Sequence, residues 1–394
     1  MLLNMPKRTL AIELHDFFSY LKRSLGNIYT RITTSAFTQS RQKLNPDVFV
    51  DINRLLTSEF YTNNEERVKL WNGYRLLSID GSKITLPCSE ALKEYYSVAH
   101  NQYKNEDVIQ ARASVLYDVL NKIVVDSILS NTEQGEITLA HQHTLYLKEN
   151  DLVILDRGYP SFELAHLILE QESDFIFRCK HDFSNATKQF IASGKDESII
   201  KIQPKQNGSF KGKAITRKSS LDVRFIRIQL DTGEVELLMT SLLDTALIPL
   251  TLFKALYYKQ WGIEIFYNRI KNILALENFS GLTPNAIQQD FYCAMFMSNI
   301  QTLIIEENES KVKEKYPDRK YEYQINTSVS LGLLKYRILD LFLQKGVQET
   351  LQELEELLIT NLVPIKKGRK YKREPNKYRR RTKPPMFTNR KKVL

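Results

Sequence analysis

The chain has 394 residues, which is too long for one small hydrophobic core and predicts two or three domains. Hydrophobic residues make up 42% and charged residues 26%, as is ordinary for a soluble globular protein, and there is no apolar run long enough to span a membrane. Three well-separated cysteines, Cys88, Cys179 and Cys293, argue against a disulfide framework and against a cysteine zinc site. We therefore expect a cytoplasmic protein with no membrane partner.

The net charge of +10 comes almost entirely from the end of the chain. Residues 366–392 hold 14 Lys or Arg and a single Glu, which leaves 42 basic and 45 acidic residues elsewhere. The segment is rich in proline and poor in apolar residues, so we expect 364–394 to be a basic, disordered arm. Its cations, Arg379, Arg380 and Arg381 among them, suit contact with the DNA backbone. The alternative is a tail that serves only solubility.

Residues 1–72 have apolar side chains at helical spacing and are expected to form a helical N-terminal region. The stretch "TTSAFTQSRQKLNPDVF" predicts a short helix capped by Thr34 or Ser35. Polar residues on this helix, including Arg41 and Lys43, suit docking on DNA. They suit a simple helical cap almost equally well.

From residue 73 to residue 181 the pattern becomes that of a mixed α/β core. "YRLLSIDGSKITLP" predicts a strand that runs to Asp80, turns at Gly81 and continues. "DLVILDRGYPS" predicts a short buried strand with Asp156 at its C-terminal edge. The expected order of three strands, a helix, a strand, a helix and a strand predicts a sheet with antiparallel and parallel parts.

The pattern of apolar and polar residues divides the rest of the chain into further segments. We expect a β-rich insertion over 182–246, with a hairpin turning at Asp231-Thr232-Gly233. The last core helices follow over 247–305, and a helical C-terminal region covers 306–363.

The stretch "YYKQWGIEIFYNRIK" places Tyr257, Glu264 and Lys271 seven residues apart. A heptad drifts only about 20° around an α-helix, so these side chains are expected on one stripe, with Gln260 beside it. Taken alone, such a pattern also fits a solvated helix face.

Asp80, Asp156 and Glu264 form a candidate metal site, two acids on strands and one on a helix. A lone carboxylate beside a buried strand is costly, and a hard divalent cation such as Mg²⁺ or Mn²⁺ makes a cluster tolerable. Two such ions suit phosphodiester chemistry. The alternative is that the two aspartates are turn residues, since Gly81 and Gly158 lie close by in the sequence.

Three motifs together, "SIDGSKITLP", "VILDRGYPS" and "YYKQWGIEIFYNRIKNILALENFSG", resemble the DDE transposases of bacterial insertion sequences, in the branch named after insertion sequence four. The resemblance covers residues from about 30 to 305. It implies an RNase H-like catalytic core that is interrupted by a β-rich insertion before the last acid. Asp80, Asp156 and Glu264 are then the catalytic residues and would hold two Mg²⁺ or Mn²⁺ ions.

The resemblance also implies the partners and the reaction. Water would attack at a transposon end, and the freed 3′-OH would attack target DNA. The partners would be terminal inverted repeats and target DNA, bound by a dimer near the nucleoid, with Tyr257 and Lys271 contacting the DNA. The signature arginine is Gln260 here, which leaves open a DNA-binding relative that no longer cuts.

Two further functions are compatible with the same residues. A host nuclease of RNase H type would cut without specific ends, and a basic regulatory protein would use its acids only to cap turns. Arg157 and Arg178 flank the ends of core strands. Each of them is expected to have one of two roles: contact with a phosphate, or a structural ion pair.

Overall fold

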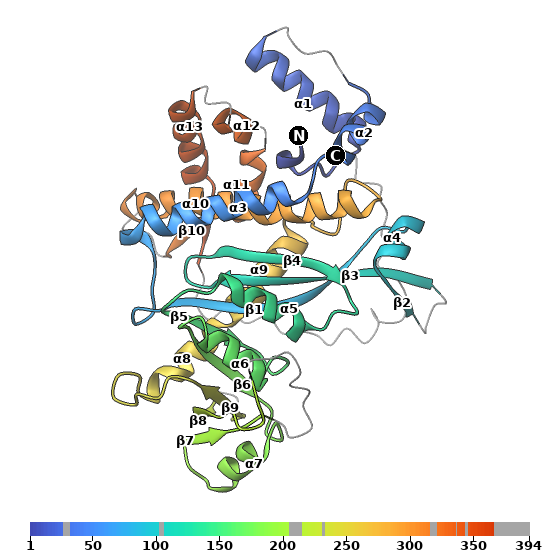
Figure 1. Ribbon diagram of the computed structural model, residues 1–394. Coiled ribbons are helices and arrows are strands. Elements are labelled where there is room, and N and C mark those ends of the chain that lie inside the picture. The colour runs from blue at the N-terminus through green and yellow to red at the C-terminus, as the bar shows by residue number, and fades with distance from the viewer. Residues whose placement is uncertain are drawn as a thin grey trace. The chain divides into compact units, whose positions relative to one another are not determined.

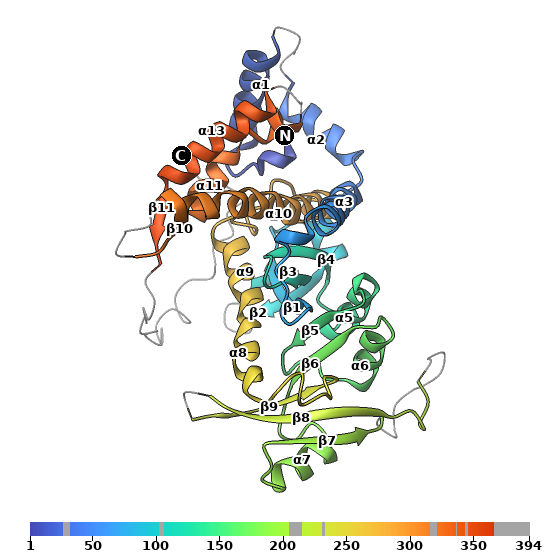
Figure 2. The same ribbon diagram turned by 90° about the vertical axis from the view of Figure 1, so that its left-hand side faces the viewer.

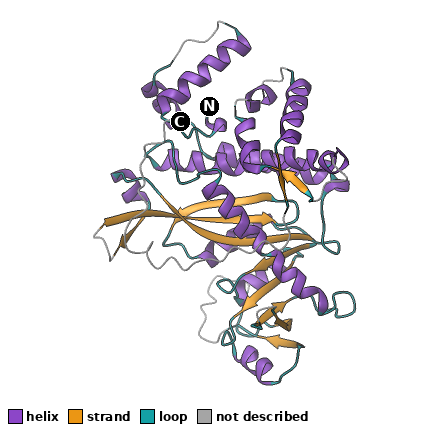
Figure 3. Ribbon diagram, turned by 180° about the vertical axis from the view of Figure 1, so that it is seen from behind, coloured by secondary structure: helices purple, strands orange, loops and turns teal. Residues whose placement is uncertain are grey.

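The computed structural model describes residues 1–26, 32–101, 106–204, 215–230, 233–315, 321–335, 337–342 and 346–365. Most of the predicted basic arm, with Arg379, Arg380 and Arg381, lies outside these residues. The chain forms two compact units. The helical unit comprises residues 1–53, 85–110 and 269–394, and the sheet unit comprises 54–84 and 111–268. Figure 3 shows the helices and strands of the described residues.

The sheet is mixed, as the sequence predicts. Its strands are β1 (Arg75–Thr85), β2 (Ser97–Asn101), β3 (Glu106–Asp118), β4 (Ile123–Asn131), β5 (Asp151–Leu155), β6 (Asp174–Cys179), β7 (Glu197–Ile202), β8 (Leu221–Gln229) and β9 (Val235–Thr240). Their order is β2-β3-β1-β5-β6-β9-β8-β7, with β4 also paired to β3 (Figure 1). β1, β5 and β6 are parallel, whereas β3 and β4 are antiparallel. This arrangement confirms the expected mixed α/β core with antiparallel and parallel parts.

The predicted β-rich insertion is part of the same sheet. β9 pairs antiparallel with β6, and β8 and β7 follow outward in antiparallel pairs. The hairpin of β8 and β9 is confirmed, although two of its expected turn residues, 231 and 232, lie outside the described residues. The boundaries at 182 and 246 stay a prediction.

Helices cover both faces of the parallel strands. The helices of this unit are α5 (Glu136–His143), α6 (Phe162–Leu169), α7 (Asn185–Ala192), α8 (Thr251–Lys259) and α9 (Trp261–Asn272). On one face, Leu77 and Val153 pack against residues of α5, α6 and α7. On the other, Leu76 and Leu152 pack with residues of α8 (Figure 2). Because successive side chains of a strand point to opposite faces, each strand contributes residues to two hydrophobic cores, one on each face of the sheet.

The helical unit confirms the helical character predicted for both end regions. Its elements are α1 (Leu10–Leu25), α2 (Thr34–Gln42), α3 (Asp47–Asn63), α4 (Glu90–Tyr95), α10 (Pro284–Lys315), α11 (Thr327–Leu334), α12 (Arg337–Phe342), α13 (Val347–Thr360) and the paired strands β10 (Tyr323–Ile325) and β11 (Leu362–Pro364). α10 contacts α2, α4 and α13. The α2 cap is Thr33, whose side chain accepts a hydrogen bond from the Ala36 N–H, one residue before the predicted caps.

Candidate active site

Two aspartates lie level with each other on neighbouring parallel strands, Asp80 within β1 and Asp156 directly after β5. In the β1–β5 register Ser78 is opposite Ile154, and the Ser78 hydroxyl donates a 3.0 Å hydrogen bond to the Ile154 carbonyl oxygen. Asp80 and Asp156 each follow two residues beyond this pair. Side chains alternate along a strand, so both aspartates continue the face that α8 covers.

The third acid, Glu264, is on α9, and aromatic contacts hold this helix against the strands. The Tyr267 hydroxyl donates a 2.8 Å hydrogen bond to the backbone carbonyl oxygen of Asp80. The Phe266 ring stacks on Tyr117, with 4.7 Å between the centroids. Both residues lie within one turn of Glu264, which is exposed, so they hold this part of α9 against β1 and β3.

The charges of nearby acids act on Asp80. Burial raises the pKa of Asp80 to about 7. The backbone N–H of Gly81 opposes this rise, and the negative charges of Glu136, Asp156 and Glu264 add to it. All four acids belong to the sheet unit, and that they form one site stays a prediction.

Glu136 was not singled out from the sequence, and its side chain accounts for the glycine at position 81. Gly81 lies inside β1, which continues to Thr85, so the predicted turn at Gly81 is wrong. A methyl group at Gly81 would lie only 3.1 Å from Cγ of Glu136, and one at Gly158 would lie 3.7 Å from Oε2. The contact at Gly81 is tighter than an ordinary one, so this glycine leaves room for the Glu136 side chain, whereas the contact at Gly158 is an ordinary van der Waals distance.

Asp156 belongs to a network of ion pairs. Arg178 donates a 3.0 Å hydrogen bond to Asp156 and also binds Glu236 through two nitrogens. Arg157, whose side chain is 43% exposed, donates a 2.7 Å hydrogen bond to Glu236. Burial opposes ionisation of Glu236, but the two arginines more than offset it and lower its pKa. Of the two roles left open for these arginines, the structural ion pair is the one observed.

The signature segment is not one continuous helix. α8 ends at Lys259 and α9 begins at Trp261, with Gln260 between them. The N–H of Gln260 bonds to the carbonyl of Tyr257, and the N–H of Ile263 bonds to that of Gln260. Each bond spans three residues rather than four, which tightens the chain at this point. Tyr257 is therefore on α8, whereas Glu264 and Lys271 are on α9.

Tyr257 is almost fully buried, and the guanidinium of Arg178 lies over its ring. The guanidinium carbon of Arg178 lies 5.6 Å from the ring centroid, within range of a cation–π interaction. Arg178 thus places a guanidinium next to Tyr257.

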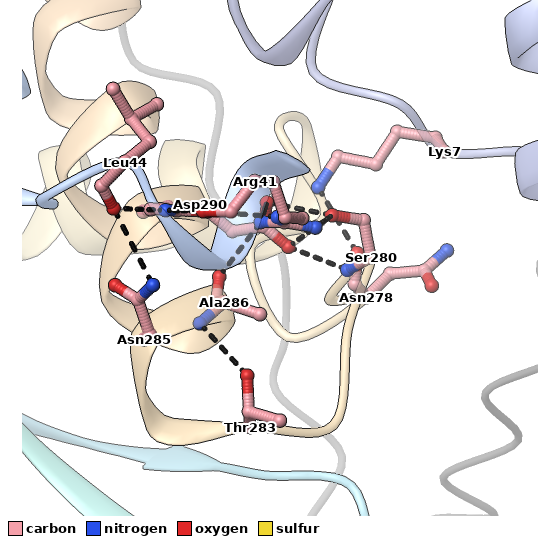
Figure 4. Close-up of polar contacts among 10 residues, drawn as sticks. Lys7, Arg41, Leu44, Asn278, Ser280, Thr283, Asn285, Ala286 and Asp290 are labelled. Atoms are coloured by element: carbon pink, nitrogen blue, oxygen red, sulfur yellow. Dashed lines mark hydrogen bonds and ion pairs between the residues drawn. The ribbon is translucent and has the colours of Figure 1, made fainter. Parts of the chain in front are cut away.

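Arg41, a predicted DNA contact, is buried in the helical unit (Figure 4). Its guanidinium donates hydrogen bonds of 2.7 to 3.1 Å to Gln289, Ser280, the carbonyl oxygen of Ala286, and Asp290. These contacts tie α2 to the start of α10. The structure corrects the prediction, because a side chain engaged in this way has a structural role. Lys43, two residues on, is exposed.

Residues 71–300, more than half of the chain, match the family described as Transposase DDE domain. The chain belongs to this family. The transposase domain covers all three acids of the candidate site and the signature segment. Among the described residues, we find no helix with the length and hydropathy of a membrane span.

Two known proteins are similar to this chain. The putative transposase InsZ of Escherichia coli strain K12 is 26% identical over 144 residues, which are 36% of this chain and 47% of InsZ. The match thus spans about half the length of that relative. The second is a cryo-EM structure of the piggyBac transposase synaptic complex with hairpin DNA. The match covers 75% of this chain and 59% of the chain in that structure, at 11% sequence identity and a TM-score of 0.41.

The transposase domain implies divalent cations, and the acids fit them by chemistry. Asp80, Asp156, Glu264 and Glu136 supply only oxygen ligands, and a cation relieves the repulsion that acts on Asp80. Within the described ranges, no three His, Cys, Asp or Glu side chains already lie close enough to hold an ion.

Gly262→Ala is expected to push α9 away from the sheet. A methyl group at this position would lie 2.6 Å from Cγ1 of Val119, so one of the two has to shift. Overpacking of this kind costs about 1–3 kcal/mol in unfolding free energy. Urea denaturation of Gly262→Ala, Val119→Ala and the double variant checks this. If Gly262→Ala lowers the free energy of unfolding by the same amount in the Val119→Ala background as in the wild type, Val119 is not the obstacle.

Proposed function

We propose that this protein is a transposase that cuts a phosphodiester bond at each end of a mobile element and joins the freed 3′-OH to target DNA. The observation that supports this most is the level placement of Asp80 and Asp156 on paired strands, with the charge of Glu264 acting on Asp80. Convergent carboxylates of this kind, inside a transposase DDE domain, suit metal-assisted phosphoryl transfer.

Asp80, Asp156 and Glu264 would hold two Mg²⁺ or Mn²⁺ ions. Bound there, the ions supply the charge that activates the attacking oxygen and stabilises the leaving oxygen. The protein's own part is positioning. Tyr267 ties α9 to the backbone of Asp80, and Arg178 fixes the orientation of the Asp156 carboxylate.

The proposed reaction has two steps of the same kind. Water attacks the phosphorus at the element end, a new P–O bond forms, and the bond to the 3′-oxygen breaks. The released 3′-OH then attacks a phosphodiester of the target and displaces its 3′-oxygen. Each step exchanges one P–O bond for another, so the protein forms no covalent intermediate.

Cations around the site are proposed to hold the DNA. Arg157 is exposed enough to reach a phosphate, and Arg178 supplies the guanidinium that Gln260 lacks. Because Tyr257 is buried beneath Arg178, we propose that it acts by positioning this arginine rather than by direct contact. Lys271 on α9, Lys43 on the surface and the basic arm add sequence-independent attraction. Two ends must be cut together, so we expect a dimer in the DNA complex, in the cytoplasm near the nucleoid.

The test uses purified protein with Mg²⁺ and labelled DNA that carries the inverted repeats flanking the gene. A matched duplex has the same composition with the repeats scrambled, and a third substrate is an RNA–DNA hybrid. A transposase nicks the first substrate at the repeat boundary and leaves the others intact. Equal cutting of the scrambled duplex, or preference for the hybrid, would contradict the proposal and favour a nuclease of RNase H type.

The second candidate is a relative that binds DNA but cuts poorly, because Gln260 replaces the signature arginine. Gln260→Arg is expected to speed cutting about tenfold, since a charge-assisted hydrogen bond contributes about 1.5 kcal/mol or more over a neutral one. Single-turnover nicking measures this, with Gln260→Met as the control that removes hydrogen bonding without adding charge. No gain from arginine would show that Arg178 already fills the role.

A further inference from the structure

Glu236 lies on β9 and is the buried end of the ion-pair network that reaches Asp156. Its side chain is 2% exposed, against 23% for Arg178 and 46% for Asp156. Its carboxylate accepts hydrogen bonds from two nitrogens of Arg178 and from one nitrogen of Arg157. A carboxylate buried this deeply is tolerated only where such partners compensate its charge. The network is therefore anchored in the sheet at Glu236 and becomes more exposed toward Asp156.

The sheet places these side chains in one row across three neighbouring strands. Asp156 and Arg178 each directly follow the last aligned pair of the parallel strands β5 and β6. In the antiparallel register of β6 and β9, Arg178 is opposite Leu238, two positions from Glu236. Ile176 and Leu238 belong to the core that α8 covers. Because side chains alternate along a strand, Arg178 and Glu236 point to this same face, and strand register brings them together.

Glu236 determines where the third nitrogen of Arg178 points. Nε and Nη2 of Arg178 bind Glu236, and Nη1 donates the 3.0 Å hydrogen bond to Oδ1 of Asp156. A guanidinium is planar and rigid, so two bonds to one carboxylate fix the direction of the remaining nitrogen. The orientation of the Asp156 carboxylate thus depends on Glu236, although the two acids do not share a hydrogen bond of their own.

We propose that Glu236 is a positioning residue for DNA cutting, which acts on Asp156 through Arg178. This inference rests on the proposed function, because it takes the catalytic role of Asp156 from there. A buried carboxylate that only stabilised the sheet would change the free energy of unfolding and leave the cutting rate of the folded protein unaltered. The rate of the folded protein therefore separates the two roles.

The first measurement asks whether Glu236 holds Arg178, and it requires no cutting. It follows the exchange of the Arg178 Nε–H proton with water by NMR, with the signal assigned by its absence from Arg178→Lys. Glu236→Gln keeps the shape of the side chain and removes its charge, and Glu234→Gln, on the exposed residue before β9, is the matched control. We expect exchange about tenfold faster in Glu236→Gln only. An unchanged exchange rate in this variant would overturn the proposal.

The second measurement is single-turnover nicking of the inverted-repeat DNA with Mg²⁺ at saturating DNA, on variants that urea denaturation shows to be folded. Glu236→Gln is expected to slow nicking about tenfold. Its DNA affinity should not fall, because both arginines keep their charge. If Glu236 acts through Arg178, adding Glu236→Gln to Arg178→Met should bring no further slowing. Additive losses would show that Glu236 acts independently of Arg178, which contradicts the proposal.

The possible failures are distinguishable. If Glu236→Gln does not fold, Glu236→Asp takes its place in both measurements, since it keeps the charge but is one methylene too short to hold both arginines. If the wild type nicks and the Glu236 variant nicks at the same rate, Glu236 serves only the fold and the proposed function stands. If the wild type does not nick at the repeat boundary, the proposed function fails, and the role of Glu236 in cutting fails with it.

Discussion

Asp80→Asn is expected to abolish DNA cutting and, in metal-free protein, to raise the free energy of unfolding at neutral pH. Burial and the charges of Glu136, Asp156 and Glu264 raise the pKa of Asp80 from 3.8 to about 7. Between these values the folded protein holds a proton that the unfolded chain has released. The contribution of Asp80 to stability is therefore fully present below pH 3.8 and is lost as the pH rises through 7.

The lost contribution is on the order of a few kcal/mol. Urea denaturation in EDTA at about pH 5 and about pH 8 compares wild type, Asp80→Asn and the exposed control Asp182→Asn. Wild type and the control should lose stability at the higher pH, and Mg²⁺ should restore it, whereas Asp80→Asn should lose much less. The same pH dependence of stability in all three proteins would show that the site does not raise the pKa of Asp80.

Arg41→Met is expected to lower the free energy of unfolding by about 3–5 kcal/mol, because it leaves the partners of a buried charge uncompensated. The Arg41 side chain is 5% exposed and its partner Asp290 is 13% exposed. The matched control is Lys43→Met, two residues along the chain and exposed, where the change should stay within about 0.5 kcal/mol. Urea denaturation and a DNA-binding titration are made on both variants.

The two measurements separate packing from DNA contact. We expect Arg41→Met to lose stability, and Lys43→Met to lose only DNA affinity, more at low salt. If Arg41→Met kept full stability and lost DNA affinity instead, Arg41 would be a DNA contact as the sequence first indicated.

The three acids could be predicted from sequence because local patterns position them. A buried apolar run followed by Asp156 predicts a strand edge, and the alternation along "RLLSID" puts Asp80 on a defined face. Glu136 could not be found in this way. A glutamate at the start of a helix is common for electrostatic reasons alone, and only the tertiary fold brings it to Gly81.

The errors have similar causes. Gly81 looks like a turn residue, but its missing Cβ makes room for a side chain from another element. The break at Gln260 depends on backbone hydrogen bonds that do not alter the helical periodicity. Arg41 on a polar helix looks exposed, yet its ion pair with Asp290 spans 249 positions of sequence, which no local pattern reveals.

The central claim is that Asp80, Asp156 and Glu264 act together in metal-dependent cutting. The most direct measurement is Mg²⁺-dependent nicking at the repeat boundary by wild type, Asp80→Ala, Asp156→Ala and Glu264→Ala, with Glu133→Gln, on the exposed turn before α5, as the control. Each loss of a ligand should cost several kcal/mol of transition-state stabilisation, or about a thousandfold in rate, while the control cuts normally. Nicking at the wild-type rate by any of the three alanine variants would contradict the account.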